Sequence, residues 1–141
     1  MEKTINKKWY FDQSPAEVWN YLTKSDLIEE WLMKNNFKPI LGHQFQFTFE
    51  SKGNQYLGVV NCKVLEIVPH SKLVYSWEGS TVEGDRKFSS VVEWRLIKIN
   101  NGTELQLSHN GFTVLEDILA HSSGWDACLN KFTNLINTNK Q

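Results

Sequence analysis

The side chains best suited to metal binding or nucleophilic chemistry are four histidines and two cysteines. They are His43, His70, His109, His121, Cys62 and Cys128. A zinc site requires ligands at short, characteristic spacings, such as two histidines four residues apart with a glutamate between them, or a CxxC pair. Neither spacing occurs in the chain. We therefore expect no metal ion and no cofactor, and cysteines that are reduced and structural.

Motifs for nucleophilic or phosphate chemistry are also missing from the sequence. It contains no Gly-x-Ser-x-Gly elbow, no P-loop and no dinucleotide-binding fingerprint. Glu93 and Arg95 alternate with apolar residues, which predicts a surface pair rather than an acid–base pair. Asp117 and Asp126 lie near the predicted C-terminal helix, where the helix dipole favours acidic residues. Catalysis stays open, because some enzymes only orient a substrate in a cavity, but the sequence favours a protein without enzymatic activity.

His109 is the histidine that the pattern directs toward the interior. It shares one strand face with Leu105 and Leu107, since every second residue of a strand points to the same side. Such a histidine can orient a ligand or change its protonation state near neutral pH. It can equally be a core histidine whose hydrogen bonds are all satisfied. Both interpretations are kept.

Charge and composition limit the classes of partner. The formal net charge is −1, the fifteen Lys and Arg residues are scattered, and the sequence pI is about 6.4. Nucleic-acid binding and membrane anchoring by basic segments both need concentrated positive charge, so we expect neither. The N-terminal segment has no apolar core of a secretion signal, and no run of eighteen apolar residues predicts membrane insertion. We predict a cytoplasmic protein.

Alternating apolar residues and turn signals predict six strands and three helices. The predicted strands are Ile5–Phe11, His43–Glu50, Gln55–Val68, Lys72–Glu78, Phe88–Lys98 and Thr103–Asn110. Ser14-Pro15-Ala16-Glu17 is typical of a capping box at the start of the first helix, and a second short helix is predicted at Ser25–Leu32. An apolar stripe predicts a long helix at Trp125–Ile136, capped by Ser122 or Ser123. Before it, the spacing of Leu115, Ile118 and Leu119 indicates a helical turn.

This order of elements predicts an α+β fold built as one domain over residues 1–141. Short connections between the last five strands favour antiparallel neighbours. The sheet has an apolar face that must be covered, and the long C-terminal helix is the one element able to lie across it. We expect a six-stranded curved antiparallel sheet wrapped around that helix, with the two short helices after the first strand.

Several stretches resemble one known family in the same order along the chain. They are residues 9–19 (WYFDQSPAEVW), 38–42 (KPILG), 58–60 (GVV), 66–69 (EIVP), 72–77 (KLVYSW), 102–112 (GTELQLSHNGF) and 124–125 (GW), followed by Leu129. Together they are similar to the activator-of-heat-shock-protein-90-ATPase-like branch of the START/SRPBCC superfamily. The resemblance implies a helix-grip fold with a deep hydrophobic cavity between the sheet and the C-terminal helix.

The predicted ligand-binding residues line that implied cavity. They are Trp31, Phe45, Phe47, Tyr75, Trp77, Trp94, Leu107, His109, Phe112, Trp125 and Leu129. Aromatic rings make good cavity walls and equally good core, and both interpretations are kept. We predict an apolar small molecule as partner, such as a lipid, a polyketide or an aromatic metabolite, oriented by His109 or Tyr75. The alternatives are a protein-interaction module that contacts a chaperone, and a cavity enzyme of hydrolase, cyclase or dehydratase type.

Overall fold

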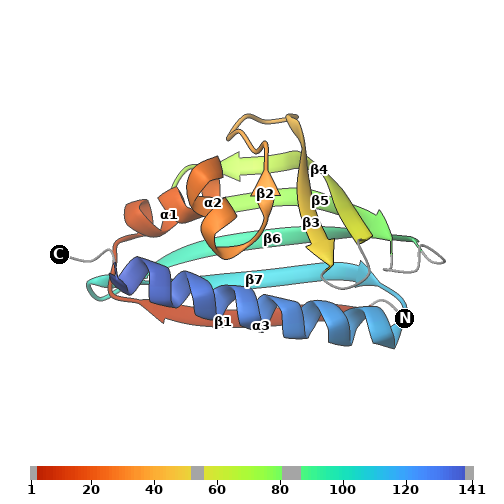
Figure 1. Ribbon diagram of the computed structural model, residues 1–141. Coiled ribbons are helices and arrows are strands. Elements are labelled where there is room, and N and C mark those ends of the chain that lie inside the picture. The colour runs from red at the N-terminus through yellow and green to blue at the C-terminus, as the bar shows by residue number, and fades with distance from the viewer. Residues whose placement is uncertain (1–2, 52–55, 81–86, 139–141) are drawn as a thin grey trace.

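The computed structural model describes residues 3–51, 56–80 and 87–138, and its frame is one curved antiparallel sheet (Figure 1). In chain order the strands are β1 (Lys3–Phe11), β2 (Lys34–Asn35), β3 (Gln44–Ser51), β4 (Tyr56–Val68), β5 (Lys72–Ser80), β6 (Lys87–Ile99) and β7 (Gly102–Phe112). Their order in the sheet is β1-β7-β6-β5-β4-β3-β2. Consecutive strands from β2 to β7 are therefore neighbours, and β1 joins the sheet beside β7.

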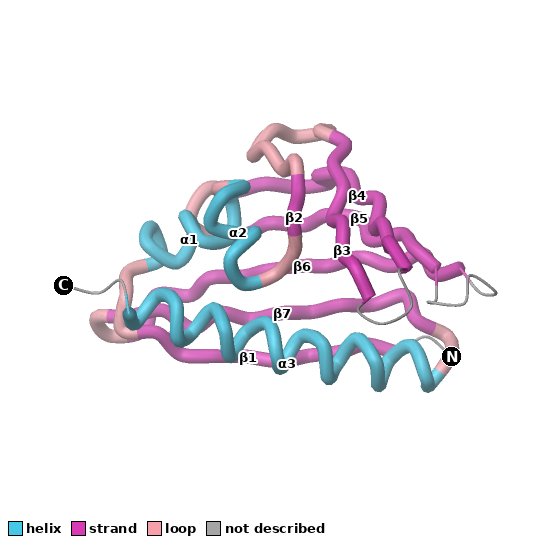
Figure 2. The backbone as a smooth tube through the Cα atoms, viewed as in Figure 1, coloured by secondary structure: helices cyan, strands magenta, loops and turns pink. Residues whose placement is uncertain are grey.

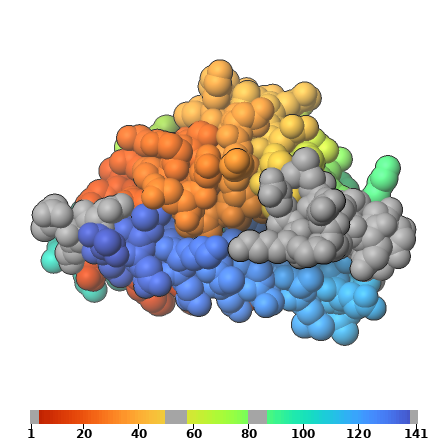
Figure 3. Space-filling view, viewed as in Figure 1, coloured from red at the N-terminus to blue at the C-terminus, as the bar shows by residue number. Residues whose placement is uncertain are grey.

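Among these described residues, three helices lie on one face of the sheet: α1 (Pro15–Thr23), α2 (Ser25–Trp31) and α3 (Leu115–Thr138) (Figure 2). At the start of α1, the Ser14 hydroxyl accepts the Glu17 amide at 3.3 Å, and the Glu17 carboxylate accepts the Ser14 amide at 3.4 Å. The predicted capping box is thus confirmed. The space-filling view shows the segment of α1 and α2 directly against the C-terminal half of α3 (Figure 3).

The predicted helix-grip architecture is confirmed, but the predicted count of six strands is wrong. In the described part of the chain the sheet has seven strands, and the additional one is β2, which pairs Lys34 with Thr48 and Asn35 with Phe47. Two residues cannot display the alternation by which a strand is recognised in a sequence. The strand forms because the chain after α2 runs along the edge of β3.

The predicted start of the C-terminal helix at Trp125 is also wrong. Helix α3 begins at Leu115 and spans 24 residues, so Ser122 and Ser123 lie inside it and do not cap it. Serine and glycine are weak helix formers, which is why the Ser-Ser-Gly segment at 122–124 predicted an end. The side chains on both sides of this segment, His121 and Trp125, are anchored in the interior. The contacts of these two side chains therefore keep the segment at 122–124 helical.

Register between the strands aligns their inward-facing residues in rows. Trp94 of β6 lies opposite Leu73 of β5 and Leu107 of β7, and Val92 lies opposite His109. All five are buried. On the other face of β6, the guanidinium of Arg95 donates to the carboxylate of Glu93, as the predicted surface pair requires.

Helix α3 runs along the side of the sheet formed by β1 and β7, while β3 and β4 curve away from it (Figure 1). Lys7 of β1 joins the two layers, since its ammonium lies 2.7 Å from the Asp126 carboxylate in the middle of α3. This ion pair explains why a lysine interrupts the apolar alternation of β1. The bounds of α3 also show that Asp126 is not a helix-start residue, whereas Asp117 is in the first turn.

Candidate functional site

The fold brings all eleven predicted ligand-binding residues together in the interior. They come from α2, four of the strands and the middle of α3, and none of them has more than 3 % of its surface exposed. All but His109 belong to one continuous apolar core, and His109 is a buried polar residue whose ring contacts Trp77, Phe112 and Trp125 of that core. That they share this interior is a structural finding, whereas their contact with a ligand stays a prediction.

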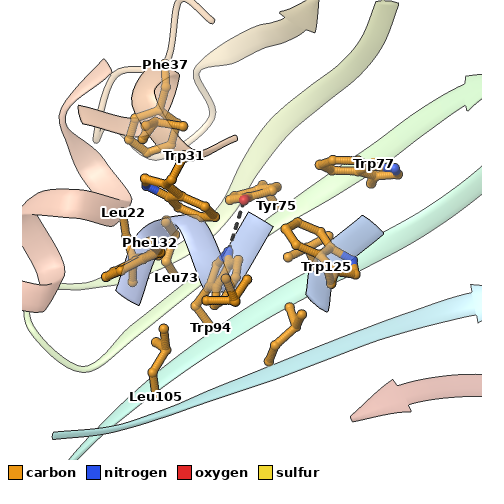
Figure 4. Close-up of a cluster of buried hydrophobic side chains, with 14 of the residues drawn as sticks. Leu22, Trp31, Phe37, Leu73, Tyr75, Trp77, Trp94, Leu105, Trp125 and Phe132 are labelled. Carbon is orange, nitrogen blue, oxygen red and sulfur yellow. Dashed lines mark hydrogen bonds between the residues drawn. The ribbon is translucent and has the colours of Figure 1, made fainter. Parts of the chain in front are cut away.

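Ring-to-ring contacts connect most of these residues. At the centre, the indole of Trp94 meets Trp31 and Trp125 edge-on, with ring centroids 6.0 and 5.5 Å away (Figure 4). From Trp125 the contacts continue to Trp77 at 5.4 Å, and from there to Phe47 at 5.4 Å. Aromatic pairs in this range stabilise a core beyond the area that they bury. The rings therefore form a connected layer between α3 and the inner face of the sheet.

Tyr75 places a hydroxyl group inside this layer. Its oxygen accepts the indole N–H of Trp94 at 3.0 Å (Figure 4). Burial strongly raises the pKa of the Tyr75 phenol, so the group is neutral at any physiological pH. A neutral buried phenol can both accept and donate a hydrogen bond.

His109 is fully buried and has a partner at each ring nitrogen. The indole N–H of Trp125 donates to Nδ1 at 3.0 Å, and the Ser90 hydroxyl lies 2.8 Å from Nε2. An indole nitrogen can only donate, so Nδ1 is the unprotonated nitrogen and Nε2 carries the hydrogen. The Nε2–H then donates to Ser90 Oγ, and Ser90 donates onward to the Trp77 carbonyl at 3.0 Å. Every hydrogen-bonding position of the imidazole is used.

His121 completes a second pairing of the same kind, which sequence reasoning missed. The indole N–H of Trp77 donates to His121 Nε2 at 3.3 Å, and His121 Nδ1 donates to the Asp117 carbonyl at 2.8 Å. His121 lies outside the predicted C-terminal helix, because that helix was predicted to begin only at Trp125. The spacing of Asp117, His121 and Trp125 at four-residue intervals is the signal that could have placed all three on one helix face.

Both histidines are held in the neutral form. Burial, and secondarily the neighbouring His121, lowers the pKa of His109 to about 3. Burial also lowers the pKa of His121, against the opposing effect of the Asp117 carbonyl and carboxylate. The two imidazoles lie perpendicular to each other with centroids 5.4 Å apart. Each accepts a hydrogen bond from a tryptophan of the opposite layer, so together they join α3 to β5 and β7.

The Ser90 hydroxyl and the His109 imidazole are as close as a nucleophile and its general base, but the nitrogen that faces Ser90 is the protonated one. A general base must present an unprotonated nitrogen to the hydroxyl that it activates. Here Trp125 occupies the unprotonated nitrogen, and the protonated one faces Ser90. The pair as it stands is a structural link and does not activate Ser90.

In the described ranges 3–51, 56–80 and 87–138, no three His, Cys, Asp or Glu side chains are grouped closely enough to hold a metal ion. Within the same ranges, no helix combines the length and the apolar character needed to cross a bilayer.

Two surface depressions lie on the outer face of the sheet. One, of about 450 Å³, is bordered by polar residues of β1, β6 and β7, including Lys8, Arg95 and Gln106. The other, of about 650 Å³, is bordered by polar residues of β3, β4 and β5, including Gln46, Asn61 and Ser76. Their linings mix polar side chains with apolar ones, such as Leu107 in the first and Phe45 in the second, and both depressions open to solvent.

Helix α3 also carries exposed apolar side chains near its beginning. Leu115 is 58 % exposed and Leu119 is 60 % exposed. A spacing of four residues places both on the same side of the helix. They face away from the interior, where Trp125 and Leu129 of the same helix are buried.

Comparison with known proteins agrees with the architecture. A family profile described as "Activator of Hsp90 ATPase homolog 1-like protein" matches residues 12–137. No curated protein has a sequence that matches the chain. The crystal structure of protein MLL2253 from Mesorhizobium loti is similar over 99 % of this chain and 100 % of its own, with 30 % identity and a TM-score of 0.87.

Two further solved structures share the fold at lower identity. The AHSA1 protein from Silicibacter pomeroyi has 14 % identity and a TM-score of 0.84, over 98 % of this chain and 100 % of its own. DynU16, a protein of the dynemicin biosynthetic locus, has 14 % identity and a TM-score of 0.81, over 97 % of this chain and 48 % of its own. With a family profile that covers most of its length, this chain belongs to the Activator of Hsp90 ATPase homolog 1-like family.

Proposed function

We propose that this protein binds an apolar small molecule between the inner face of the sheet and helix α3. The observation that carries the proposal is the ring layer itself. Where β3 and β5 lie farther from α3, the space is spanned by large side chains such as Phe47, Trp77 and Trp125 rather than by close backbone packing. Rings of this kind turn about two torsions, so a ligand can enter by displacing them.

The driving force for binding is the removal of apolar surface from water, about 25 cal/mol for each Å² buried. The interior suits an uncharged ligand, because no lysine or arginine is among the buried residues that the structure describes. An aromatic or polyketide-like ligand is part of the proposal, and DynU16, which shares the fold, is a protein of the dynemicin biosynthetic locus. A cytoplasmic location and the absence of a nucleic-acid partner stay predictions from the sequence.

The six tryptophans provide an internal test by NMR. Trp31, Trp77, Trp94 and Trp125 lie in the ring layer, whereas Trp9 and Trp19 lie outside it on β1 and α1. The indole N–H signals are followed during titration with naphthalene, fluorene and dodecanol, all of which are uncharged. We expect the first four signals to shift and the last two to stay in place. No shift with any compound, or equal shifts of all six signals, would overturn the proposal.

A second function, contact with a protein, is favoured by one observation. Leu115 and Leu119 form an exposed apolar pair on one side of α3. If a specific partner binds there, Leu115→Ser with Leu119→Ser abolishes its binding, and saturation of the interior with an apolar compound leaves it unchanged. A partner whose binding survives the double substitution would exclude this surface.

A further inference from the structure

The hydrogen bonds of the buried polar groups can be followed one by one through the ring layer. The indole N–H of Trp31 donates to the Tyr21 carbonyl at 2.8 Å. Those of Trp77 and Trp125 donate to the two histidines, as described above. The indole N–H of Trp94 donates to the Tyr75 oxygen. All four indoles of the layer are therefore satisfied within the protein.

Tyr75 differs from its neighbours in this respect. Its oxygen accepts one hydrogen bond, but among the described residues no acceptor is within reach of its own O–H hydrogen. Buried donors are nearly always paired, and leaving one unpaired costs about 1–3 kcal/mol. His109, the other candidate for orienting a ligand, has no hydrogen-bonding position left.

Flat apolar side chains surround the Tyr75 ring. The ring centroids of Phe45, Phe47 and Phe37 lie 5.3, 6.1 and 6.5 Å from that of Tyr75. No buried lysine or arginine is available in the described part of the chain to neutralise a ligand carboxylate. A ligand alcohol would bring a hydrogen of its own that needs an acceptor, whereas a carbonyl oxygen only accepts. The surroundings therefore match an aromatic molecule with a neutral carbonyl group.

We infer that Tyr75 is the polar recognition residue of the interior, and that it donates its hydroxyl hydrogen to the carbonyl oxygen of a neutral aromatic ketone. This inference rests on the proposed binding of an apolar small molecule. It assigns orientation of the ligand to Tyr75 and gives His109 a structural part, linking α3 to the sheet.

The test compares two pairs of compounds that differ in one carbonyl group: fluorenone with fluorene, and benzophenone with diphenylmethane. A single neutral hydrogen bond contributes about 0.5–1.5 kcal/mol, so the ketone of each pair is expected to bind about 2- to 12-fold more tightly. Tyr75→Phe should remove this preference while still binding the hydrocarbons. Ser90→Ala, which deletes another buried hydroxyl, should retain it.

A measurement on the unaltered protein covers the case in which Tyr75→Phe fails to fold. The infrared carbonyl stretch of bound fluorenone should lie at lower frequency than in an apolar solvent, because a donated hydrogen bond weakens the C=O bond. A ketone preference that persists in Tyr75→Phe, equal affinities within both pairs, or an unshifted stretch would overturn the inference. Binding of the hydrocarbons without a ketone preference leaves the proposed function intact, whereas failure of all four compounds to bind contradicts both.

Discussion

The indole of Trp125 on α3 and the imidazole of His109 on β7 are joined by a 3.0 Å hydrogen bond in a fully buried position. This bond determines which nitrogen of His109 is protonated, and through it the direction of the bond to Ser90. Protonation of His109 by acid would break this contact between α3 and the sheet, because a protonated imidazole cannot accept a hydrogen bond from Trp125.

The first prediction concerns pH. The pKa of His109 is about 3 in the folded protein and about 6.5 in the unfolded chain, so below pH 6.5 the unfolded chain binds the proton more readily. The contribution of His109 to stability is therefore complete above pH 6.5 and is lost as the pH falls toward 3. From about pH 7 to about pH 5 this amounts to about 2 kcal/mol. Urea unfolding at a series of pH values measures it.

His109→Gln is the control for this prediction. A glutamine can accept from Trp125 and donate to Ser90, but it does not titrate. Its free energy of unfolding should fall less steeply with acid than that of the parent protein. Identical pH profiles for the two proteins would show that protonation of His109 does not cause the loss of stability. His121, which faces His109 from α3, would then be the next histidine to replace.

The second prediction uses two glycines in opposite situations. Gly111 has a φ of +111°, and a Cβ there would lie 3.0 Å from the Ser89 carbonyl oxygen and from Ser90 Cα. Gly124 lies in α3, and a Cβ there would meet nothing within 4 Å. Gly111→Ala should destabilise the protein by about 1–3 kcal/mol. Gly124→Ala should stabilise it by about 0.5–1 kcal/mol, since alanine is the better helix former. Thermal unfolding of both variants checks the opposite signs.

The third prediction compares two leucines of α3. Leu129 is fully buried, whereas Leu119 is 60 % exposed. Leu129→Ala should lower the free energy of unfolding by about 2–5 kcal/mol, because it removes buried methyl groups and leaves a cavity. Leu119→Ala should change it by no more than about 0.5 kcal/mol. Chemical denaturation provides both values, and similar losses in the two variants would contradict the placement of α3.

The fourth prediction concerns the ion pair between Lys7 and Asp126. The Asp126 side chain is 59 % exposed, so solvent screens the interaction and its contribution is small. A double-mutant cycle with Lys7→Met and Asp126→Asn should give a coupling energy below about 1 kcal/mol, and high salt should reduce it further. A larger, salt-insensitive coupling would mean that the pair is effectively buried.

The sheet could be predicted from the sequence because strand alternation is a local property. Phe45 and Phe47, or Trp94 and Leu96, reveal an inner face by their spacing alone, and the structure buries all four. The capping box at Ser14 is equally local. These elements could be predicted without knowing which distant segments contact them in the folded protein.

The parts that sequence reasoning missed depend on contacts between distant segments. Helix α3 continues through a Ser-Ser-Gly segment because His121 pairs with Trp77, which lies 44 residues away in the sequence. His121 was not predicted as a residue of the site for the same reason, because its partner Trp77 is distant in the sequence. Likewise, nothing near Tyr75 in the sequence shows that Trp94 supplies a donor to its oxygen.

Lys7 has a consequence for how the protein behaves among copies of itself. β1 is the long outermost strand of the sheet, and such a strand offers unpaired backbone groups to any other extended chain. The inward lysine, held by a carboxylate on the helix, makes that strand a poor template, because an added strand would force its ammonium away from water. At the opposite border, β2 is only two residues long. Both borders of the sheet thus discourage edge-to-edge aggregation.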